Sequence, residues 1–425
     1  MAYLRNHLVF HPLLFEALSN TSSPIRFATS MLSSRRWQEE SSEASTIPSS
    51  SSSLSSSSSS SRTLWIDTDV GFDDLVAISS LLHYSKRNDR DDQIESRSVD
   101  RSIDIGLVTT VGGIQANPLD SAKFLQTELL STTTDTTAVI PGLAPRTIQD
   151  EEGKTIPSWL ENTRQDLKSL YSKEATLENH HTSNSSSSSS SSSSKRSRSS
   201  LDTEKGRDQL IQFLTSEDDH SVDLLCLGPL TNIAYCLDDD IFLQDVMASK
   251  LRQVWIMGGN NPSISRVPEF NFATDALAAA QVLEGILQNR IRIVPAQTCE
   301  IQNNSNQKKL EATWERLTTL ATSKESSSTL DLQRHPMLHR VFQINPEFSS
   351  LKYDTICAFA YYRGQDQQVP IEQIQMQMRV DSTSGALLPV AEEDDEVSGH
   401  SFVTQIPLRG ENGFFQWIQE AIEAR

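Results

Sequence analysis

The chain has 425 residues, which is enough for one large α/β domain or two smaller ones, each with a sizeable hydrophobic core. Its formal net charge is −19, and this excess of acids argues against nucleic acid as a partner, because phosphate contacts need clusters of Lys and Arg. No apolar run approaches the ~18 residues needed to span a bilayer. The composition therefore favours small-molecule chemistry without a membrane partner.

Serine dominates two stretches of the chain, residues 38–62 and residues 178–206. The second contains an unbroken serine run from Ser185 to Ser194. Such segments have too little apolar surface to offset the entropy lost on ordering them. We therefore expect a disordered tail over residues 1–61, one domain over residues 62–425, and a disordered insert in that domain at about residues 178–206.

Basic residues outnumber acids at the amino terminus, where residues 1–37 contain four arginines and a single acid, Glu16. This composition is typical of an organellar transit peptide, although an ordinary tail has the same features. A location in the cytoplasm or in an organelle is expected. The four cysteines, Cys226, Cys236, Cys299 and Cys357, lie far apart and form no CxxC pair. Cys226 and Cys357 lie inside apolar runs, which favours reduced core residues over disulfides or a zinc site.

Short apolar strands alternate with helical patterns from residue 63 onwards, which predicts an α/β fold with a mostly parallel central sheet flanked by helices. Strands are expected at 63–69, 103–111, 138–140, 222–227, 253–257 and 291–296. Helices are expected between them at 74–84, 119–130, 207–214, 230–237 and 274–287. Further along, 305–345 and 413–424 have helical patterns, and 375–381 and 401–406 resemble strands. Several strands run into glycine-containing turns, so the residues after them should converge at one edge of the sheet.

Four aspartates follow the first predicted strand within residues 67–74, namely Asp67, Asp69, Asp73 and Asp74. Unpaired carboxylates this close together would repel one another by several kcal/mol in a low dielectric, so a cation is expected among them. Calcium suits a flexible site of oxygen ligands better than magnesium does. Alternatively, Asp73 or Asp74 caps the following helix. An EF-hand is excluded, because no Glu lies twelve positions after the first Asp.

The segment Asp67-Thr68-Asp69-Val70-Gly71-Phe72-Asp73-Asp74 resembles the DTDPGxDD signature of the inosine-uridine nucleoside hydrolase family, with Val70 at the usual proline. Four later segments are similar to motifs of the same family, in the same order. They are residues 227–234 (LGPLTNIA), 257–259 (MGG), 269–275 (EFNFATD) and Tyr353-Asp354, where the family has His-Asp. The resemblance covers Arg62 to the carboxyl terminus, apart from the serine insert.

The resemblance implies calcium-dependent hydrolysis of the N-glycosidic bond of ribonucleosides to ribose and free base, in a homo-oligomer. The implied calcium ligands are Asp69, Asp74, the backbone carbonyl of Leu227, and Asp354. Asp69 would also be the general base. The implied ribose contacts are Asp73, Glu269 and Asn271, with Met257 either lining the sugar pocket or packing in the core. Carboxylates suit this chemistry, because an oxocarbenium-like transition state develops positive charge.

The sequence departs from the family at three positions of the site. Ile114 stands where the family has an asparagine, so one polar ribose contact should be absent. A second family asparagine falls at Ser263 by offset, although Asn260 or Asn261 could fill its place. Tyr353 replaces the histidine that helps protonate the leaving base, and a phenol with its ordinary pKa near 10 is a weaker acid.

Several alternatives stay open for the leaving-group acid and for the function. Either Tyr353 or a histidine just upstream, His335 or His339, could protonate the base. A nucleoside- or ribose-binding pseudoenzyme on the same fold is one alternative function. A haloacid-dehalogenase-like phosphatase is another, but its pattern places Thr or Val where this chain has Phe72.

Overall fold

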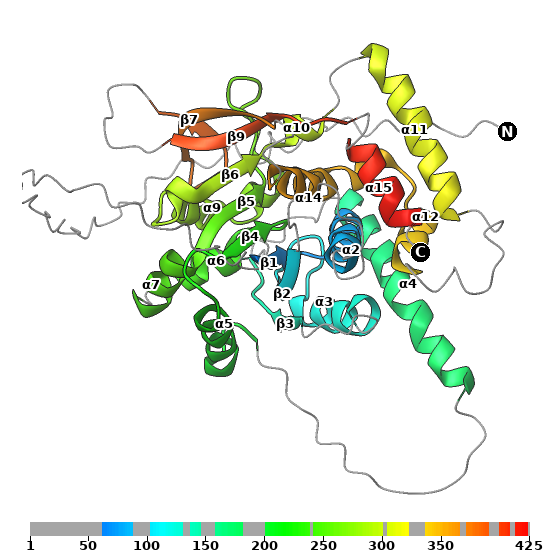
Figure 1. The fold of residues 1–425 in the computed structure, drawn as a ribbon, viewed down its shortest axis with the longest axis horizontal. Coiled ribbons are helices and arrows are strands. Elements are labelled where there is room, and N and C mark those ends of the chain that lie inside the picture. The colour runs from blue at the N-terminus through cyan, green and yellow to red at the C-terminus, as the bar shows by residue number, and fades with distance from the viewer. Residues whose placement is uncertain are drawn as a thin grey trace, which may run out of the picture. The chain divides into compact units, whose positions relative to one another are not determined.

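The computed structural model describes residues 62–87, 103–130, 137–145, 158–181, 200–238, 241–300, 304–322, 336–365, 371–390, 399–408 and 413–423. These residues belong to one compact unit, Ser58–Arg425. Within them nine strands form a sheet in the order β3-β2-β1-β4-β5-β6-β9-β7-β8 (Figure 1). The strands are β1 (Arg62–Thr68), β2 (Ile103–Thr110), β3 (Ala138–Pro141), β4 (Val222–Cys226), β5 (Leu251–Met257), β6 (Ile291–Val294), β7 (Glu372–Val380), β8 (Leu387–Pro389) and β9 (Gly399–Gln405).

The sheet is mostly parallel, as predicted. Every pairing from β3 through β1 to β6 and β9 is parallel, and only β7 pairs antiparallel, with β9 and with β8. The six strands predicted up to residue 296 are all present, with bounds that differ by two residues at most. The chain builds β1, β2 and β3 towards one edge and then returns to add β4, β5 and β6 beside β1 on the other side.

Helices cover both faces of this sheet (Figure 1). Side chains of β1 alternate between the faces, because Leu64 and Ile66 join one hydrophobic cluster while Trp65 joins the other. The helices are α2 (Phe72–Arg87), α3 (Pro118–Phe124), α4 (Ser158–His181), α5 (Glu204–Ser216), α6 (Thr231–Leu237), α7 (Ile241–Lys250), α8 (Phe270–Thr274), α9 (Ala276–Leu283), α10 (Ala296–Cys299), α11 (Asn304–Thr322), α12 (Pro336–Ile344), α13 (Phe348–Leu351), α14 (Tyr353–Gly364) and α15 (Phe414–Glu423).

The two layers of helices have different cores. On one face α2 packs against α12, α14 and α15, and buries Leu75, Phe342, Phe359 and Ile418. On the other face α5, α6 and α9 contribute Leu210, Ile233 and Val282. A π-helical turn, η1 (Leu125–Leu129), continues α3, and a 3-10 turn, η2 (Gln288–Arg290), precedes β6.

Some helices differ from the sequence-based expectation. The helix expected at 274–287 is shorter in the structure: α9 spans Ala276–Leu283, and Asp275, which separates it from α8, caps its start with the carboxylate. The 24-residue helix α4 was not predicted, and it runs to His181. Helix α5 begins at Glu204. The insert expected at about residues 178–206 overlaps the end of α4 and the start of α5, and its residues 182–199 lie outside the described residues. The predicted tail over residues 1–61, with its transit-peptide composition, also lies outside them.

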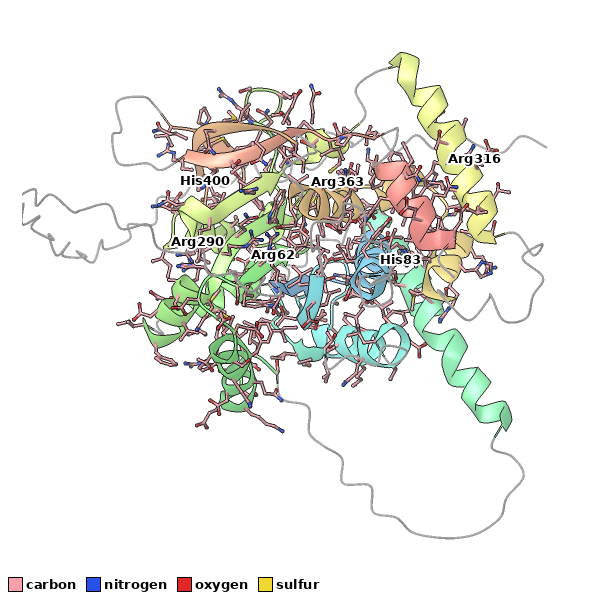
Figure 2. All side chains as sticks on the ribbon, in the orientation of Figure 1. Arg62, His83, Arg290, Arg316, Arg363 and His400 are labelled. Carbon is pink, nitrogen blue, oxygen red and sulfur yellow. The ribbon has the colours of Figure 1, made fainter. Side chains whose placement is uncertain are left out.

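Charged side chains meet at the amino end of the central strands. Arg252 forms two hydrogen bonds with the buried carboxylate of Asp223, one of them at 3.0 Å from Nε. Arg62, labelled in Figure 2, and Arg252 both donate to Oε1 of Gln365 at 2.8 Å. These bonds connect β1, β4 and β5 with Gln365 at this end, and the acids of the candidate site lie at the opposite end.

The four cysteines are buried, as expected for core residues, and none of them forms a disulfide in the described part of the chain. Among the helices of the described part of the chain, none is both long enough and apolar enough to cross a membrane.

Candidate active site

The candidate site lies at the carboxyl ends of β1 and β4, where the strand order reverses. Strand β1 leads into Asp69 and the start of α2, and β4 leads into Leu227. The two ends are joined by a hydrogen bond of 2.7 Å from the Leu227 amide to the Asp67 carbonyl. In open α/β sheets ligands bind in the crevice at such a switch point. Two of the recognised motifs are therefore brought together here by the topology.

Asp67, the first acid of the cluster, is fully buried, and its carboxylate links strands and a helix around the sheet. Its Oδ1 accepts hydrogen bonds from Thr109 Oγ1 at 2.5 Å and from Asn232 Nδ2 at 2.7 Å. Asn232 also donates to the Thr110 carbonyl and accepts from the Leu143 amide. One carboxylate and one amide thus connect β1, β2 and the loop after β3 to α6.

The side chain of Asp69 contacts the tight loop that follows β2 and contains Gly113 and Ile114. Its Oδ2 accepts a 2.7 Å hydrogen bond from the backbone amide of Ile114. A Cβ on Gly113 would lie 2.1 Å from Asp69 Oδ2, and a Cβ on Gly228 would lie 2.9 Å from the Asp69 amide nitrogen. Glycine is required at both positions because the backbone of each approaches Asp69 more closely than a side chain permits.

Asp74 is fixed by the turn that begins α2. It accepts hydrogen bonds from the Thr68 hydroxyl and, at 2.7 Å, from the Gly71 amide. The second bond satisfies an amide just before the helix, as an acid at a helix amino terminus commonly does. Burial raises the pKa of Asp74, and the neighbouring carboxylate of Asp69, which repels that of Asp74, helps to raise it further. The helix-capping alternative thus describes part of its role.

Asp73, Asp74 and Asp354 bring three carboxylates together from two helices. Each offers one oxygen, and these three oxygens lie within 4.8 Å of one another. Helix α14 carries Asp354 in its first turn, and Thr355 Oγ1 donates to the Asp73 carbonyl at 3.2 Å. Asp354 Oδ1 is buried and has no hydrogen-bond partner within the described residues. A cation with oxygen ligands fits this donor set and would satisfy that oxygen.

Burial shapes the protonation of the whole cluster. It raises the pKa of Asp69 to about 6 and that of Asp67 to about 7. The pKa of Asp73 is also raised, chiefly by burial. The pKa values of Asp74 and Asp354 lie well above the ordinary range, first because of burial and then because of neighbouring carboxylates. A bound cation would counter both effects, because it favours the charged form of each acid.

Glu269 and Asn271 line the adjacent strand end, after β5. The Glu269 carboxylate caps α8, and it accepts from the amides of Asn271, Phe272 and Gly259 at 2.9, 3.2 and 3.0 Å. Burial raises the pKa of Glu269 to about 7. Asn271 Nδ2 lies 3.1 Å from the Leu227 carbonyl and 3.6 Å from Met257 Sδ. The structure therefore brings Asn271, Leu227 and Met257 into direct contact.

The residues proposed to protonate the leaving base occupy two different places. Tyr353 begins α14 beside Asp354, and Lys352 Nζ lies 4.9 Å from the centre of its ring. Burial raises the pKa of Tyr353 above its usual value. His339 lies on α12, where its two ring nitrogens contact the Ala321 carbonyl and, at 2.7 Å, Gln343 Nε2. His335 lies outside the described residues.

At the positions where the sequence departs from the family, Ile114 and Asn260 form hydrogen bonds that hold nearby loops in place. Ile114 contributes its amide to Asp69, and its side chain packs against the hydrophobic core. Asn260 donates to the Val267 carbonyl and accepts from Gln297, so it holds the loop between β5 and α8. Ser263 is exposed in the same loop.

Sequence reasoning missed two contributors to the site. Asn232 was assigned no chemistry, yet it anchors Asp67. Arg164, on the unpredicted helix α4, donates to the carbonyls of Ile114 and Gly113, directly behind the contact with Asp69. The spacing of apolar residues on α4 could have indicated a helix, because Leu160, Arg164 and Leu167 are buried on one face. Nothing in the sequence indicated what Arg164 would contact.

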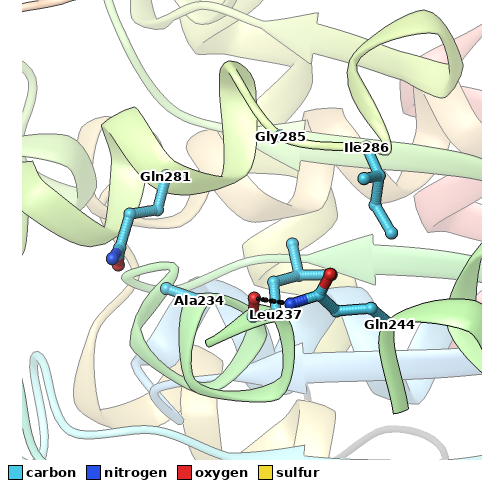
Figure 3. A pocket seen from close by; sticks show the side chains of 6 residues that line it. All are labelled: Ala234, Leu237, Gln244, Gln281, Gly285 and Ile286. Carbon is cyan, nitrogen blue, oxygen red and sulfur yellow. Dashed lines mark hydrogen bonds between the residues drawn. The ribbon is translucent and has the colours of Figure 1, made fainter. Parts of the chain in front are cut away.

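A cavity of about 200 Å³ lies elsewhere in the molecule, among α6, α7 and the end of α9 (Figure 3). It is lined by Ala234, Leu237, Gln244, Gln281, Gly285 and Ile286. Gln244 Nε2 donates a hydrogen bond to the Leu237 carbonyl at 2.7 Å, as Figure 3 shows. None of the predicted site residues lines this cavity.

The fold and the site define an α/β protein with a carboxylate-rich site for a small molecule at the switch point of its sheet. The chain belongs to the family of inosine-uridine preferring nucleoside hydrolases, whose model matches residues 64–404. This membership confirms the resemblance drawn from the five motifs. No curated protein sequence matches the chain.

Solved structures of nucleoside hydrolases share the fold. A plant nucleoside hydrolase is 17% identical, with a TM-score of 0.54 over 86% of this chain and 99% of that one. A purine-preferring ribonucleoside hydrolase from Gardnerella vaginalis is 15% identical, with a TM-score of 0.52 over 86% and 100%. An inosine-guanosine nucleoside hydrolase is also 15% identical, with a TM-score of 0.50 over 85% and 98%.

Proposed function

We propose that the chain hydrolyses the N-glycosidic bond of ribonucleosides in a calcium-dependent reaction, releasing ribose and a free base. The observation that carries the proposal is the convergence of Asp73, Asp74 and Asp354 at the switch point, with Asp354 Oδ1 buried and unpartnered among the described residues. Family membership supports the class of reaction. It leaves the phosphatase alternative without support.

The proposed calcium ligands are Asp69, Asp74, the Leu227 carbonyl and Asp354, and the close approach of Asp73 makes its carboxylate a further candidate. Calcium accepts six to eight oxygens in a flexible arrangement, which suits carboxylates from two helices and a carbonyl from a strand end. When bound, it would acidify water at the site. The Leu227 carbonyl has a lone pair to offer beyond its contact with Asn271.

Asp69 is the proposed general base. Burial raises the pKa of the Asp69 carboxyl in the metal-free chain to about 6, so this carboxyl is ionised at neutral pH and can accept a proton, and a bound cation would favour the ionised form further. In the proposed reaction water adds its oxygen to the anomeric carbon and passes a proton to an Asp69 carboxylate oxygen. The bond from carbon to the base nitrogen breaks, and the base leaves with that electron pair and takes up a proton.

Asp73, Glu269 and Asn271 are proposed to bind the ribose hydroxyls, with Met257 against the sugar. Buried acceptors suit this task, because each hydroxyl is a donor that loses its water partners in the site. For the leaving base, Tyr353 is the proposed proton donor and His339 the second candidate. Tyr353 is favoured because it immediately precedes Asp354, a member of the carboxylate cluster, at the start of α14. His339 already contacts the Ala321 carbonyl.

The decisive experiment incubates the purified full-length chain with inosine, uridine, cytidine or adenosine and measures free ribose, with and without a calcium chelator. We expect ribose release that chelation abolishes and that Asp69→Asn lowers by about 10²-fold or more. Asp166→Asn is the control, because Asp166 is an exposed carboxylate on α4. Unchanged ribose release in Asp69→Asn would contradict the proposed base.

Measurements on the same purified chain distinguish an enzyme from a binding protein on this fold. Calcium that raises the melting temperature, together with nucleosides that bind but release no ribose, would support the pseudoenzyme alternative, which the departures at Ile114 and Tyr353 motivated. A homo-oligomer and a cytoplasmic or organellar location stay predictions. Light scattering of the purified chain and imaging of a tagged copy in cells would test them.

A further inference from the structure

A buried arginine lies directly behind the loop that holds Asp69. The side chain of Arg164 comes from α4 and only 6% of the residue is exposed. Its Nε donates to the Ile114 carbonyl at 2.7 Å, and its Nη2 donates to the Gly113 carbonyl at 3.0 Å. The guanidinium thus bonds two consecutive carbonyls of the loop after β2. Such a fork of parallel donors is specific to arginine, because an ammonium group has no fixed plane.

One peptide group links this guanidinium to the carboxylate. The Gly113 carbonyl and the Ile114 amide belong to the same peptide, and no cis peptide occurs in the described chain. In a planar trans peptide these two groups point in opposite directions. The carbonyl end faces Arg164, while the amide end donates to Asp69 Oδ2 at 2.7 Å. The peptide dipole is therefore aligned between a positive and a negative group, which strengthens both hydrogen bonds.

The alternative orientation of this peptide would be unfavourable for the site. A flip of the Gly113–Ile114 peptide would turn its carbonyl oxygen towards the Asp69 carboxylate, where two acceptors would repel each other. Glycine at 113 makes such a flip sterically easy, since it lacks a Cβ. The bonds from Arg164 fix the carbonyl on the opposite side. Without these donors both carbonyls would be buried and unsatisfied, which favours rearrangement of the loop once Arg164 is removed.

We infer that Arg164 is a positioning residue, which holds the Gly113–Ile114 peptide so that its amide fixes the carboxylate of Asp69 in the orientation needed to bind calcium and accept a proton. This inference rests on the proposed function of Asp69. Arg164 contacts neither substrate nor metal in this role, and its effect passes through one backbone hydrogen bond.

The test compares Arg164→Met and Arg164→Lys with Arg340→Met in the full-length chain. Arg340 is a matched control, because its Nη2 donates to the Leu170 carbonyl at 2.7 Å and so anchors the same helix, α4, away from the site. For the nucleoside that the wild-type protein cleaves, kcat and KM are measured separately. Calcium affinity is measured by isothermal titration calorimetry, and the melting temperature is recorded for every variant.

We expect Arg164→Met to lower kcat by about 10- to 100-fold and to weaken calcium binding by about 10-fold, with KM changed by less than about threefold. Arg164→Lys should show a smaller loss of kcat in the same direction, because it keeps the charge but cannot form both directed bonds. It also carries the test if the Met variant does not fold. Arg340→Met should keep kcat and calcium affinity within about twofold, even where its melting temperature falls.

Two results would overturn the inference. One is a kcat and a calcium affinity in both Arg164 variants within twofold of the wild type. The other is an equal loss in Arg340→Met, which would mean that docking of α4 alone matters. Failure of the proposed function differs from failure of this inference, because in the first case the wild-type protein itself releases no ribose. Calcium affinity of the variants still tests the positioning of Asp69 in that case.

Discussion

Gly113 lies against the Asp69 carboxylate so closely that no side chain fits between them. In Gly113→Ala the added Cβ would lie 2.1 Å from Oδ2, well inside van der Waals contact. Either the loop or the carboxylate must move, and displacement of reacting groups by about 1 Å can cost 10²-fold in rate. We expect ribose release to fall by about 10-fold or more and calcium affinity to fall with it.

The control for this variant is Ala116→Ser, an exposed position in the same loop. It should leave both the rate and calcium affinity unchanged. Rates and calorimetric titrations of the two variants provide the measurement. An alanine at position 113 with wild-type kcat would show that the loop does not press on Asp69.

Val70 adopts a backbone conformation that is rare for a β-branched residue, with φ of 58°. Its amide donates to Thr68 Oγ1 at 3.1 Å, and its side chain is fully buried. Proline, which the family usually carries here, holds φ near −65° and has no amide hydrogen. Val70→Pro should therefore destabilise the chain by more than ~1 kcal/mol and disturb the turn that orients Asp69 and Asp74.

Val70→Ala serves as the comparison, because it removes the buried methyl groups of Val70 but keeps the amide hydrogen and leaves φ unrestricted. Thermal unfolding and calcium titration should rank the proline variant below the alanine variant in both stability and affinity. A proline variant that matches or exceeds the alanine variant would contradict the left-handed conformation at this position.

At the scale of elements, the site depends on how α14 docks against α2. Thr355 is fully buried and its hydroxyl contacts the Asp73 carbonyl at 3.2 Å and the Leu351 carbonyl at 2.6 Å. Thr355→Val keeps the shape of the side chain and removes these bonds. We expect a loss of ~1–2 kcal/mol in unfolding free energy and weaker calcium binding, because the register of Asp354 against Asp73 is loosened.

The matched control is Thr215→Val on α5, where an exposed threonine hydroxyl bonds the Ile211 carbonyl of its own helix. This variant should unfold within about 0.5 kcal/mol of the wild type and bind calcium normally. Chemical denaturation and calorimetry distinguish the two. Normal calcium affinity in Thr355→Val would show that α14 is positioned by packing alone.

The helices also show where local patterns predict structure and where they do not. Helix α15 was predicted from its amphipathic spacing. Its apolar side chains lie on one face and pack into a single hydrophobic cluster, which leaves a periodic pattern in the sequence. Helix α14 appeared in the sequence only as an apolar segment, since nearly all its side chains are buried and no polar face marks the helical period. Its start at Tyr353, which places Asp354 opposite Asp73, depends on contacts with α2.

For the whole molecule, the buried acids make stability depend on pH. Burial raises the pKa of Asp67 from 3.8 to about 7, of Asp69 from 3.8 to about 6, and of Glu269 from 4.5 to about 7. Between about pH 4 and 7 the folded chain therefore holds protons that the unfolded chain has released. Stability is greatest below that window and falls as pH rises through it.

We expect the calcium-free protein to melt several degrees lower at pH 8 than at pH 5, and calcium to stabilise it more at pH 8. Scanning fluorimetry with a chelator or with calcium at both values measures this. Asp67→Asn should flatten the pH dependence, because one titrating group is removed. A chelated protein that melts higher at pH 8 than at pH 5 would contradict the sign.

The sequence by itself determined the class of fold, the family and the members of the acidic cluster. Parallel strands of an α/β fold are short apolar runs, and residues 67–74 carry their chemistry in adjacent positions, so both can be read locally. Glu269, Asn271 and Asp354 were found because they lie in recognisable motifs. Their specific roles in the reaction stay predictions.

Only the tertiary structure decided how these residues are held. It separated Asp67, bonded to Thr109 and Asn232, from the group formed by Asp73, Asp74 and Asp354. It also placed Arg164 behind the loop over Asp69, although some fifty residues separate Ile114 from Arg164 in the chain. Hydrogen bonds between distant segments leave no periodic pattern in sequence, because their partners meet only after the sheet and its helices have packed.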